Sequence, residues 1–240
     1  MHLAGTTYED VYRDFRWEMP ARFNIAQAIC DRHAARTPDA PALLYEEADG
    51  RLRPWTFVEV QAAANRFANV LAHLGVGRGT IVGIHLPQCP ESLISHIAIQ
   101  KRGAIALPMF TLFGPDAIGY RLGDSGARVL ISTPEAIERN ADALRGLDAL
   151  RHVISVGGPG SAAAQEFWRL SQRASPEAET ADTGPDDPAL LIYTSGTTGN
   201  PKGALHAQRV LLGHLPGVML PHDFFPQPGD RFWTPADWAW

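Results

Sequence analysis

A run of hydroxyl residues and glycines, closed by a lysine and a further glycine, occupies residues 194–203 and has the residue types of an anion-binding loop. Glycine permits backbone turns that are forbidden to other residues, and it lets backbone N–H groups approach a ligand closely. Successive N–H groups form a concavity for anions, hydroxyl groups donate to phosphate oxygens, and a lysine ammonium adds positive charge. The sequence therefore predicts a polyphosphate-binding loop, called the phosphate loop, made of Thr194, Ser195, Gly196, Thr197, Thr198, Gly199, Asn200, Pro201, Lys202 and Gly203.

A Walker A loop and a flexible surface turn are the two other interpretations of the phosphate loop. A Walker A loop needs the pattern G-x-x-x-x-G-K-[ST], whereas Lys202 follows a proline and precedes a glycine, so a P-loop NTPase is disfavoured. A flexible surface turn is the second alternative, because serine, threonine and glycine are common in turns.

An apolar run at residues 189–193 directly precedes the phosphate loop and predicts a buried strand. The loop then begins at the carboxyl end of this strand, which is where open α/β sheets bind ligands. Further upstream, apolar residues recur at steps of three and four along residues 56–75 and predict a helix. Thr56 and Glu59 match a capping box at its start, and Gly75 matches a left-handed cap at its end.

Strands and helices alternate through the rest of the chain, a pattern typical of a parallel sheet with helices on its faces. We predict an α/β fold with parallel β-sheets flanked by helices. The further predicted strands are 42–45, 80–86, 104–107, 129–131 and 153–156, and the further predicted helices are 24–33, 91–102, 115–123 and 134–144.

Composition excludes several classes of function. The chain has 240 residues, of which 45% are hydrophobic, so it is long enough to bury a core. Its formal charge of -5 and its lack of a Lys/Arg-rich run argue against nucleic acid and against an anionic membrane surface as partners. No apolar stretch reaches the roughly 18 residues of a transmembrane helix. Cys30 and Cys89 lie far apart without metal-ligand spacing, which favours reduced thiols in a cytoplasmic protein and predicts no metal site.

The chain is predicted to form one partial domain over residues 1–240, interrupted by an exposed connection. Residues 174–188 are acidic and rich in proline, and they contain no apolar residue larger than alanine. Such a segment favours an exposed connection, which divides residues 1–173 from the phosphate-loop segment 189–240.

The sequence T-S-G-T-T-G-N-P-K-G at residues 194–203 resembles the [ST]-G-[ST]-T-G-x-P-K-G signature of the adenylate-forming superfamily. That superfamily includes acyl-CoA synthetases, firefly-type luciferases and peptide-synthetase adenylation domains. W-T-F-V-E-V at 55–60 resembles its first helix entry, and K-R-G-A-I-A-L-P-M at 101–109 resembles a later segment that ends near a proline. The resemblance implies an AMP-forming ligase that joins a carboxylic acid to ATP, releases pyrophosphate, and passes the acyl group to coenzyme A. It also implies that the phosphate loop holds the β- and γ-phosphates with Mg²⁺.

Residues near the end of the chain indicate a branch of this superfamily. W-T-P-A-D-W at 233–238 resembles the segment found in acetyl- and medium-chain acyl-CoA synthetases, whereas peptide-synthetase domains tend to carry F-D-x-S there. Asp237 in this context favours an acid without an α-amino group. The candidates for the acyl site are His206, Asp237 and Trp238. The alternatives are that the tryptophan belongs to a packed core and that His206 is a packed or exposed residue preceding a helix.

Members of this superfamily are much longer than 240 residues. The resemblance places their catalytic lysine, their magnesium-binding glutamate and their small C-terminal domain beyond Trp240, so the expected fold is an incomplete N-terminal large domain. We expect such a fragment to lack full activity. The alternatives are a non-catalytic nucleotide-binding or partner-binding remnant, and an adenylation domain for another carboxylate.

Overall fold

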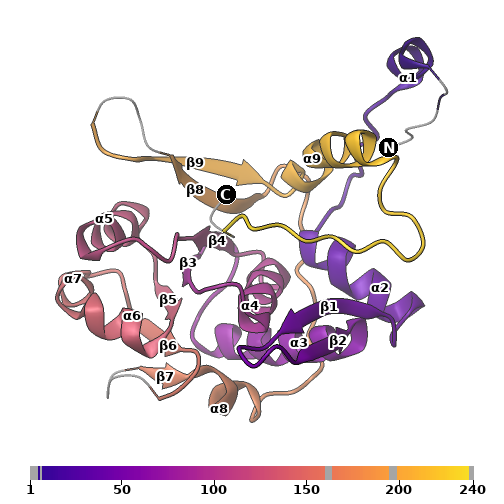
Figure 1. Ribbon diagram of the computed structural model, residues 1–240. Helices are drawn as coiled ribbons and strands as arrows, with labels where there is room; N and C mark the ends of the chain where they lie inside the picture. Colours follow the sequence, from indigo (N-terminus) through magenta and orange to yellow (C-terminus); the bar gives the residue numbers. More distant parts are fainter. Residues whose placement is uncertain (1–4, 6, 160–163, 195–198, 238–240) are drawn as a thin grey trace.

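A largely parallel sheet runs through the molecule in the computed structural model, which describes residues 5, 7–159, 164–194 and 199–237 (Figure 1). Within these residues the sheet has seven strands in the order β7-β6-β5-β3-β4-β8-β9. Every neighbouring pair is parallel except β8 and β9, which are antiparallel. The strands are β3 (Ile81–His85), β4 (Ile105–Pro108), β5 (Val129–Ser132), β6 (His152–Ser155), β7 (Gln165–Glu166), β8 (Pro188–Thr194) and β9 (Lys202–Ala207).

Helices cover both faces of this sheet, and a separate hairpin of β1 (Pro41–Glu46) and β2 (Leu52–Thr56) packs beside them. One face is covered by α3 (Phe57–His73), α4 (Pro90–Lys101) and α8 (Phe167–Ser171), and the other by α5 (Pro115–Ser125) and α7 (Ala141–Arg145). The remaining helical segments are α1 (Tyr8–Asp14), η1 (Gln27–Asp31), α2 (Arg32–Arg36), α6 (Pro134–Arg139), α9 (Val210–Met219) and η2 (Leu220–His222).

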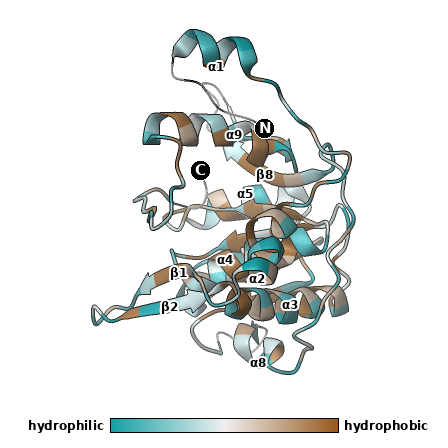
Figure 2. Ribbon diagram, turned by 90° about the vertical axis from the view of Figure 1, so that its right-hand side faces the viewer, coloured by the Kyte–Doolittle hydropathy of each residue, from teal (hydrophilic) through white to brown (hydrophobic). Residues whose placement is uncertain are grey.

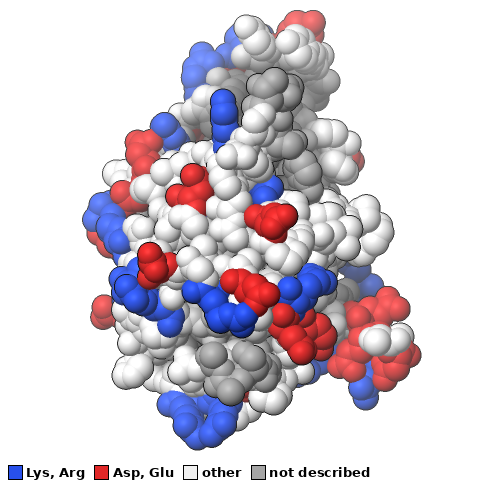
Figure 3. Space-filling model, turned by 90° about the vertical axis from the view of Figure 1, so that its left-hand side faces the viewer, with Lys and Arg blue, Asp and Glu red and all other residues white. Residues whose placement is uncertain are grey.

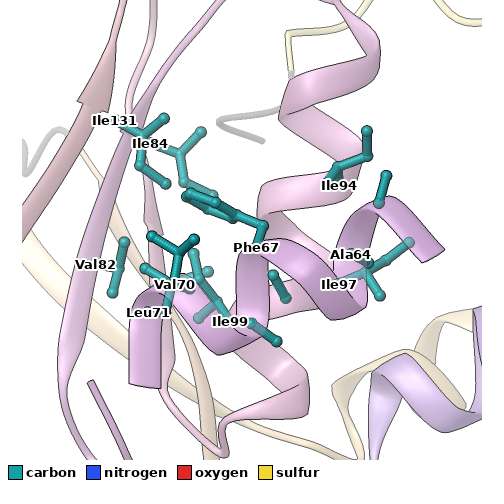
Figure 4. Packing of buried hydrophobic residues seen from close by; sticks show 14 of the residues in the cluster. Ala64, Phe67, Val70, Leu71, Val82, Ile84, Ile94, Ile97, Ile99 and Ile131 are labelled. Atoms are coloured by element: carbon teal, nitrogen blue, oxygen red, sulfur yellow. The ribbon is translucent and has the colours of Figure 1, made fainter. Parts of the chain in front are cut away.

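The central strands are buried on both faces because alternate side chains point into two different cores. Val82 and Ile84 of β3 pack with Phe67 of α3 and with the isoleucines of α4 (Figure 4). Between them, Gly83 faces α5, where an added Cβ would lie 2.9 Å from Leu122 Cδ2. The absence of a side chain at Gly83 therefore lets α5 approach the sheet closely.

The end signals of α3 are confirmed. The backbone N–H of Thr56 donates to Glu59 Oε2 at 2.8 Å, and the backbone N–H of Glu59 donates to Thr56 Oγ1 at 3.3 Å. Gly75 has a φ of 76°, which is the left-handed conformation expected of a glycine cap. Local sequence therefore determines where this helix begins and ends.

Two features of the sheet differ from the sequence prediction. Strand β9 returns antiparallel to β8, because the connection between them is far shorter than the dozen or so residues that a parallel crossover needs. Residues 52–56, where no strand was predicted, form β2, which pairs with β1. Neither pairing has a local signal in the sequence, because strand pairing depends on distant partners.

Of the predicted acidic connection at 174–188, residues 174–187 contain no helix or strand, and hydrogen bonds hold them against the body of the protein. Asn65 and Asn69 of α3 donate from their side-chain amides to backbone carbonyl groups of residues 175–177. Thr183 is buried, and its hydroxyl donates to the carbonyl oxygen of Phe23 at 2.6 Å. The connection is thus a strap fixed by hydrogen bonds, a role that its polar composition does not reveal.

Two parts of the chain project from the body. One is α1, which has no buried residue and projects in Figures 1 and 2, and the other is the turn of the β1–β2 hairpin, which projects in Figure 2. Figure 2 shows that both are mainly hydrophilic. No helix among the described residues is both long and apolar enough to cross a bilayer.

His96 of α4 gives a testable pH dependence. Burial in α4 lowers the pKa of His96 to about 4. Because the unfolded chain binds a proton near pH 6.5, this histidine's contribution to stability is complete above that pH and is lost as the pH falls toward 4.

We expect His96→Gln to reduce the loss of stability between pH 6.5 and 4, by no more than about 3 kcal/mol. Urea unfolding at a series of pH values measures this difference. The same variant compared at pH 7.5 reports any packing defect separately. An unchanged slope below pH 6.5 would contradict the prediction.

Candidate functional site

The carboxyl ends of the parallel strands meet at one edge of the sheet, where β3 ends at His85 and β5 ends at Ser132. Ser132 Oγ donates to the carbonyl oxygen of His85 at 3.1 Å and lies 3.1 Å from His85 Nδ1. Burial lowers the pKa of His85, so its imidazole is neutral at physiological pH. No sequence motif indicates that His85 belongs to a site, and only the sheet order brings it to this edge.

The two ends of the phosphate loop lie at the same edge, at the end of β8 and the start of β9. Thr194 is the last residue of β8 and pairs with Lys202, the first residue of β9, so the two ends of the loop are held side by side. Both residues are exposed, and Gly199 has a φ of 93°, a conformation that favours glycine. Of the predicted loop residues, Ser195, Gly196, Thr197 and Thr198 lie outside the described residues.

The described part of the phosphate loop offers hydrogen-bond donors and one cation. Thr194 contributes a hydroxyl group, Asn200 an amide and Lys202 an ammonium group, and residues 199–203 include no carboxylate. This donor set suits an anionic, phosphate-like ligand. Among residues 5, 7–159, 164–194 and 199–237, no cluster of three or more His, Cys, Asp and Glu side chains is placed to hold a metal ion.

Helix α5 contacts both ends of the phosphate loop. The Tyr120 hydroxyl donates to the carbonyl oxygen of Pro201 at 3.1 Å, and the Tyr193 hydroxyl donates to Asp124 Oδ2 at 2.5 Å. Burial, reinforced by the hydrogen bond to Asp124, raises the pKa of Tyr193, so this hydroxyl stays protonated and acts as the donor. The sequence prediction named neither Tyr120 nor Asp124, and it assigned Tyr193 only to the strand before the loop. Their only local signal was the spacing of Tyr120 and Asp124 by one helical turn.

Asp237, one of the candidates for the acyl site, reaches the carboxyl edge of the sheet. Thr111 Oγ1 in the loop after β4 donates to Asp237 Oδ2 at 3.5 Å, and Gln88 Nε2 in the loop after β3 donates to the carbonyl oxygen of Ala236 at 2.6 Å. Arg139 lies at the same edge of the sheet, where its Nη2 donates to the carbonyl oxygen of Thr111 at 3.4 Å. The segment ending at Asp237 therefore contacts the loops after β3 and β4. Trp238 lies outside the described residues.

His206 is half-buried inside β9, the strand that precedes α9, and it pairs with Leu190. It is four residues beyond Lys202 along the strand, which corresponds to about 14 Å at the usual rise of an antiparallel strand. The structure therefore does not bring His206 to the phosphate loop.

Charged side chains show no large region of one sign on the face that Figure 3 presents. Lys and Arg side chains alternate there with Asp and Glu side chains. Both cysteines are free, and burial raises the pKa of each thiol to about 12, so both are protonated. Neither thiol has the lowered pKa of a reactive nucleophile.

An open sheet with a change of strand order, helices on both faces and a glycine-rich loop at its carboxyl edge defines a ligand-binding α/β protein of the doubly wound kind. Residues 30–240 match the family described as AMP-binding enzyme, and the chain belongs to this family. The resemblance carried by residues 194–203 is thereby confirmed.

The most similar curated proteins include acetyl-coenzyme A synthetases. The protein from Yersinia pestis (strain Pestoides F) is 30% identical over 256 residues, and that from Shewanella sp. (strain ANA-3) is 32% identical over 263 residues. Each alignment covers 99% of this chain but only 39% of the relative, so the chain spans well under half the length of the curated proteins it matches.

Solved structures confirm the predicted α/β fold. An acyl-CoA synthetase from Brucella canis superimposes with a TM-score of 0.84 at 27% identity, covering 97% of this chain and 43% of that one. An anthranilate CoA ligase, solved with anthranoyl-AMP, gives a TM-score of 0.73 at 30% identity and covers 83% of this chain and 38% of that one. The fold is therefore that of the N-terminal domain of acyl-CoA synthetases.

Proposed function

We propose that this chain serves an acyl-CoA synthetase reaction, in which a carboxylic acid and ATP form an acyl-adenylate and pyrophosphate and the acyl group then passes to coenzyme A. The observation that carries the proposal is the phosphate loop at the carboxyl edge of a sheet whose chain matches the AMP-binding enzymes over residues 30–240. Relatives of similar identity bear the names of an acetyl and an anthranilate enzyme, so the proposal names the class of carboxylic acids.

In the proposed first step, a carboxylate oxygen attacks the α-phosphorus of ATP while the bond to the pyrophosphate oxygen breaks. Negative charge accumulates on the departing pyrophosphate, and donors fixed in advance around it lower the barrier. Thr194, Ser195, Gly196, Thr197, Thr198, Gly199, Asn200, Pro201, Lys202 and Gly203 form this cradle in the proposal. Lys202 supplies its positive charge.

Mg²⁺ belongs to the proposal as a counter-ion of the ATP phosphates. The described loop residues include no carboxylate, so we assign it no ligand in this chain. Coenzyme A enters as the thiol that receives the acyl group.

For the acyl site we propose Asp237 and Trp238, since Asp237 reaches the carboxyl edge beside the loop after β4. His206 is the weaker candidate because it lies far along β9 from Lys202.

Lys202→Ala tests the nucleotide site directly. We expect it to weaken MgATP binding by about 10- to 100-fold, because a hydrogen bond to a charged group contributes roughly 1.5–3 kcal/mol. Isothermal titration of the 240-residue chain measures the change. Arg36→Ala, which removes an exposed cation on α2, is the matched control and should bind MgATP as the wild type does.

Equal MgATP affinity in the wild type and Lys202→Ala would contradict the role of the loop, and it would favour a remnant without a working nucleotide site. The reaction class has a separate test in the whole protein, namely exchange of pyrophosphate into ATP that depends on added acid. A panel of short-chain, medium-chain and aromatic acids that supports no exchange would rule out the proposed activation step.

A further inference from the structure

Helix α5 makes one hydrogen bond to each end of the phosphate loop. On the outgoing side, the hydroxyl of Tyr193, the residue before Thr194, donates to Asp124 at 2.5 Å. On the returning side, the carbonyl oxygen of Pro201, the residue before Lys202, accepts from the Tyr120 hydroxyl at 3.1 Å. Tyr120 and Asp124 are four residues apart in a helix, so they share one face. A single rigid helix therefore holds both ends of the loop.

The ring of Tyr193 is itself held in place by packing. It lies over Gly203, its cross-strand partner, where an added Cβ would be 3.3 Å from Tyr193 Cζ. The Tyr120 and Tyr193 rings meet edge to face, with centroids 6.2 Å apart and planes at 82°. Arg121 of α5 is buried, and its guanidinium lies over the Phe113 ring, with Cζ 4.0 Å from the ring centroid. The same Cζ is 5.7 Å from the centroid of the Tyr193 ring.

We propose that Tyr120 and Asp124 of α5 are positioning residues for the phosphate loop, and that through Pro201 and Tyr193 they set its affinity for the ATP phosphates. The proposal rests on the function proposed above, in which this loop binds ATP. It goes beyond that function because neither residue belongs to the loop, and the loop signature contains neither Tyr120 nor Asp124.

The physical basis is preorganisation. An anion-binding loop must place several backbone N–H donors at once, and ordering them at the moment of binding lowers affinity. Hydrogen bonds at Tyr193 and Pro201 restrict both ends of the loop before the ligand arrives. Removing either one is expected to lower MgATP affinity without removing any group that touches phosphate.

The test uses Tyr120→Phe, Tyr193→Phe and Asp124→Ala in the 240-residue chain. Each is expected to weaken MgATP binding about 3- to 10-fold, the effect of losing one hydrogen bond of roughly 1 kcal/mol. Asp124→Asn retains an acceptor for the Tyr193 hydroxyl and should bind within about 2-fold of the wild type. Tyr12→Phe, a change in an exposed tyrosine of α1, is the matched control and should have no effect.

A double variant isolates the contact from general damage. If Tyr193 and Asp124 act on the loop through each other, combining Tyr193→Phe with Asp124→Ala should weaken binding no more than either change alone. Amide hydrogen exchange of residues 199–203, measured without nucleotide, should be faster in Tyr120→Phe and Tyr193→Phe. Thermal midpoints identify any variant that is simply unfolded, and Asp124 is exposed, so its truncation should leave the fold intact.

Weaker binding and faster exchange, with rescue by Asp124→Asn, would support the proposal. Amide hydrogen exchange that is unchanged in the variants would overturn it. So would variants that bind MgATP as tightly as a wild type that does bind it. If the 240-residue wild type binds no MgATP, the role proposed above for the phosphate loop fails in this chain, and pyrophosphate exchange in the whole protein still decides the reaction class. Amide hydrogen exchange then tests only whether Tyr120 and Tyr193 order the loop. Faster exchange in Tyr120→Phe and Tyr193→Phe would support this ordering, and unchanged exchange would contradict it.

Discussion

Lys101→Met is expected to lower the free energy of unfolding by about 3–5 kcal/mol, the usual effect of removing one partner from a buried ion pair. Lys101 at the end of α4 is 1% exposed, and its ammonium lies 2.5 Å from Asp31 Oδ1. Asp31 also accepts hydrogen bonds from Gln61 at 2.8 Å and Thr180 at 2.8 Å. Methionine fills similar space but leaves the carboxylate of Asp31 without its cation. Urea unfolding of the variant and the wild type at pH 7 measures the loss.

Two comparisons separate the ion pair from general effects on packing. Arg145→Met breaks the exposed pair with Asp142 on α7 and should change stability by less than about 1 kcal/mol. The double variant Lys101→Met with Asp31→Leu should be less destabilised than the sum of the two single changes, because it leaves no unpaired charge. A loss below about 1 kcal/mol in Lys101→Met would show that Asp31 is satisfied by water or by its other partners.

The surroundings of Asp31 also predict how the stability of the fold changes as the pH falls. Burial opposes ionisation of this carboxyl group, but hydrogen bonds from Gln61, Lys101 and Thr180 outweigh it and hold its pKa below the usual value. The ionised group therefore stabilises the fold at neutral pH, and this contribution is lost as the pH falls below about 4. The loss of unfolding free energy that Lys101→Met causes at pH 7 should become smaller at lower pH, as Asp31 becomes protonated.

Phe67→Ala is expected to lower the free energy of unfolding by about 3–5 kcal/mol, since it leaves a cavity in the core between the sheet and helices α3 and α4. Phe67 is 0% exposed and its ring centroid is 4.2 Å from that of Phe167. Its side chain lies between α3, α4 and the sheet (Figure 4). A loss of this size is a large part of the roughly 5–15 kcal/mol that stabilises a typical domain. Urea unfolding measures it, and a shift in far-UV circular dichroism would show whether the variant still folds.

Phe232→Ala is the matched control for the core variant. Phe232 is 60% exposed and belongs to the segment that leads to Asp237. The same truncation there removes little buried surface and should change stability by less than about 1 kcal/mol. Equal losses at Phe67 and Phe232 would contradict the assignment of the core.

Local sequence determined the elements whose signals lie within the element itself. The helix over α3 follows from its apolar spacing, its capping box and Gly75, and β3, β4 and β5 follow from short runs of apolar residues. The identity of residues 194–203 as a family signature is also local, because it depends on the order of residue types along one loop. These features need only near neighbours in the chain, so the sequence contains them directly.

Tertiary structure alone decided which distant groups meet. Three sets of contacts join residues separated by long stretches of chain: those of Lys101 with Asp31, those of the strap at 174–187, and those of α5 with both ends of the phosphate loop. The antiparallel return of β9 and the arrival of Asp237 beside Thr111 belong to the same group. Such contacts depend on the order and twist of strands and on which helix face meets which strand. A phosphate-loop signature can therefore be identified from sequence, whereas the groups that hold it in place become visible only in the folded protein.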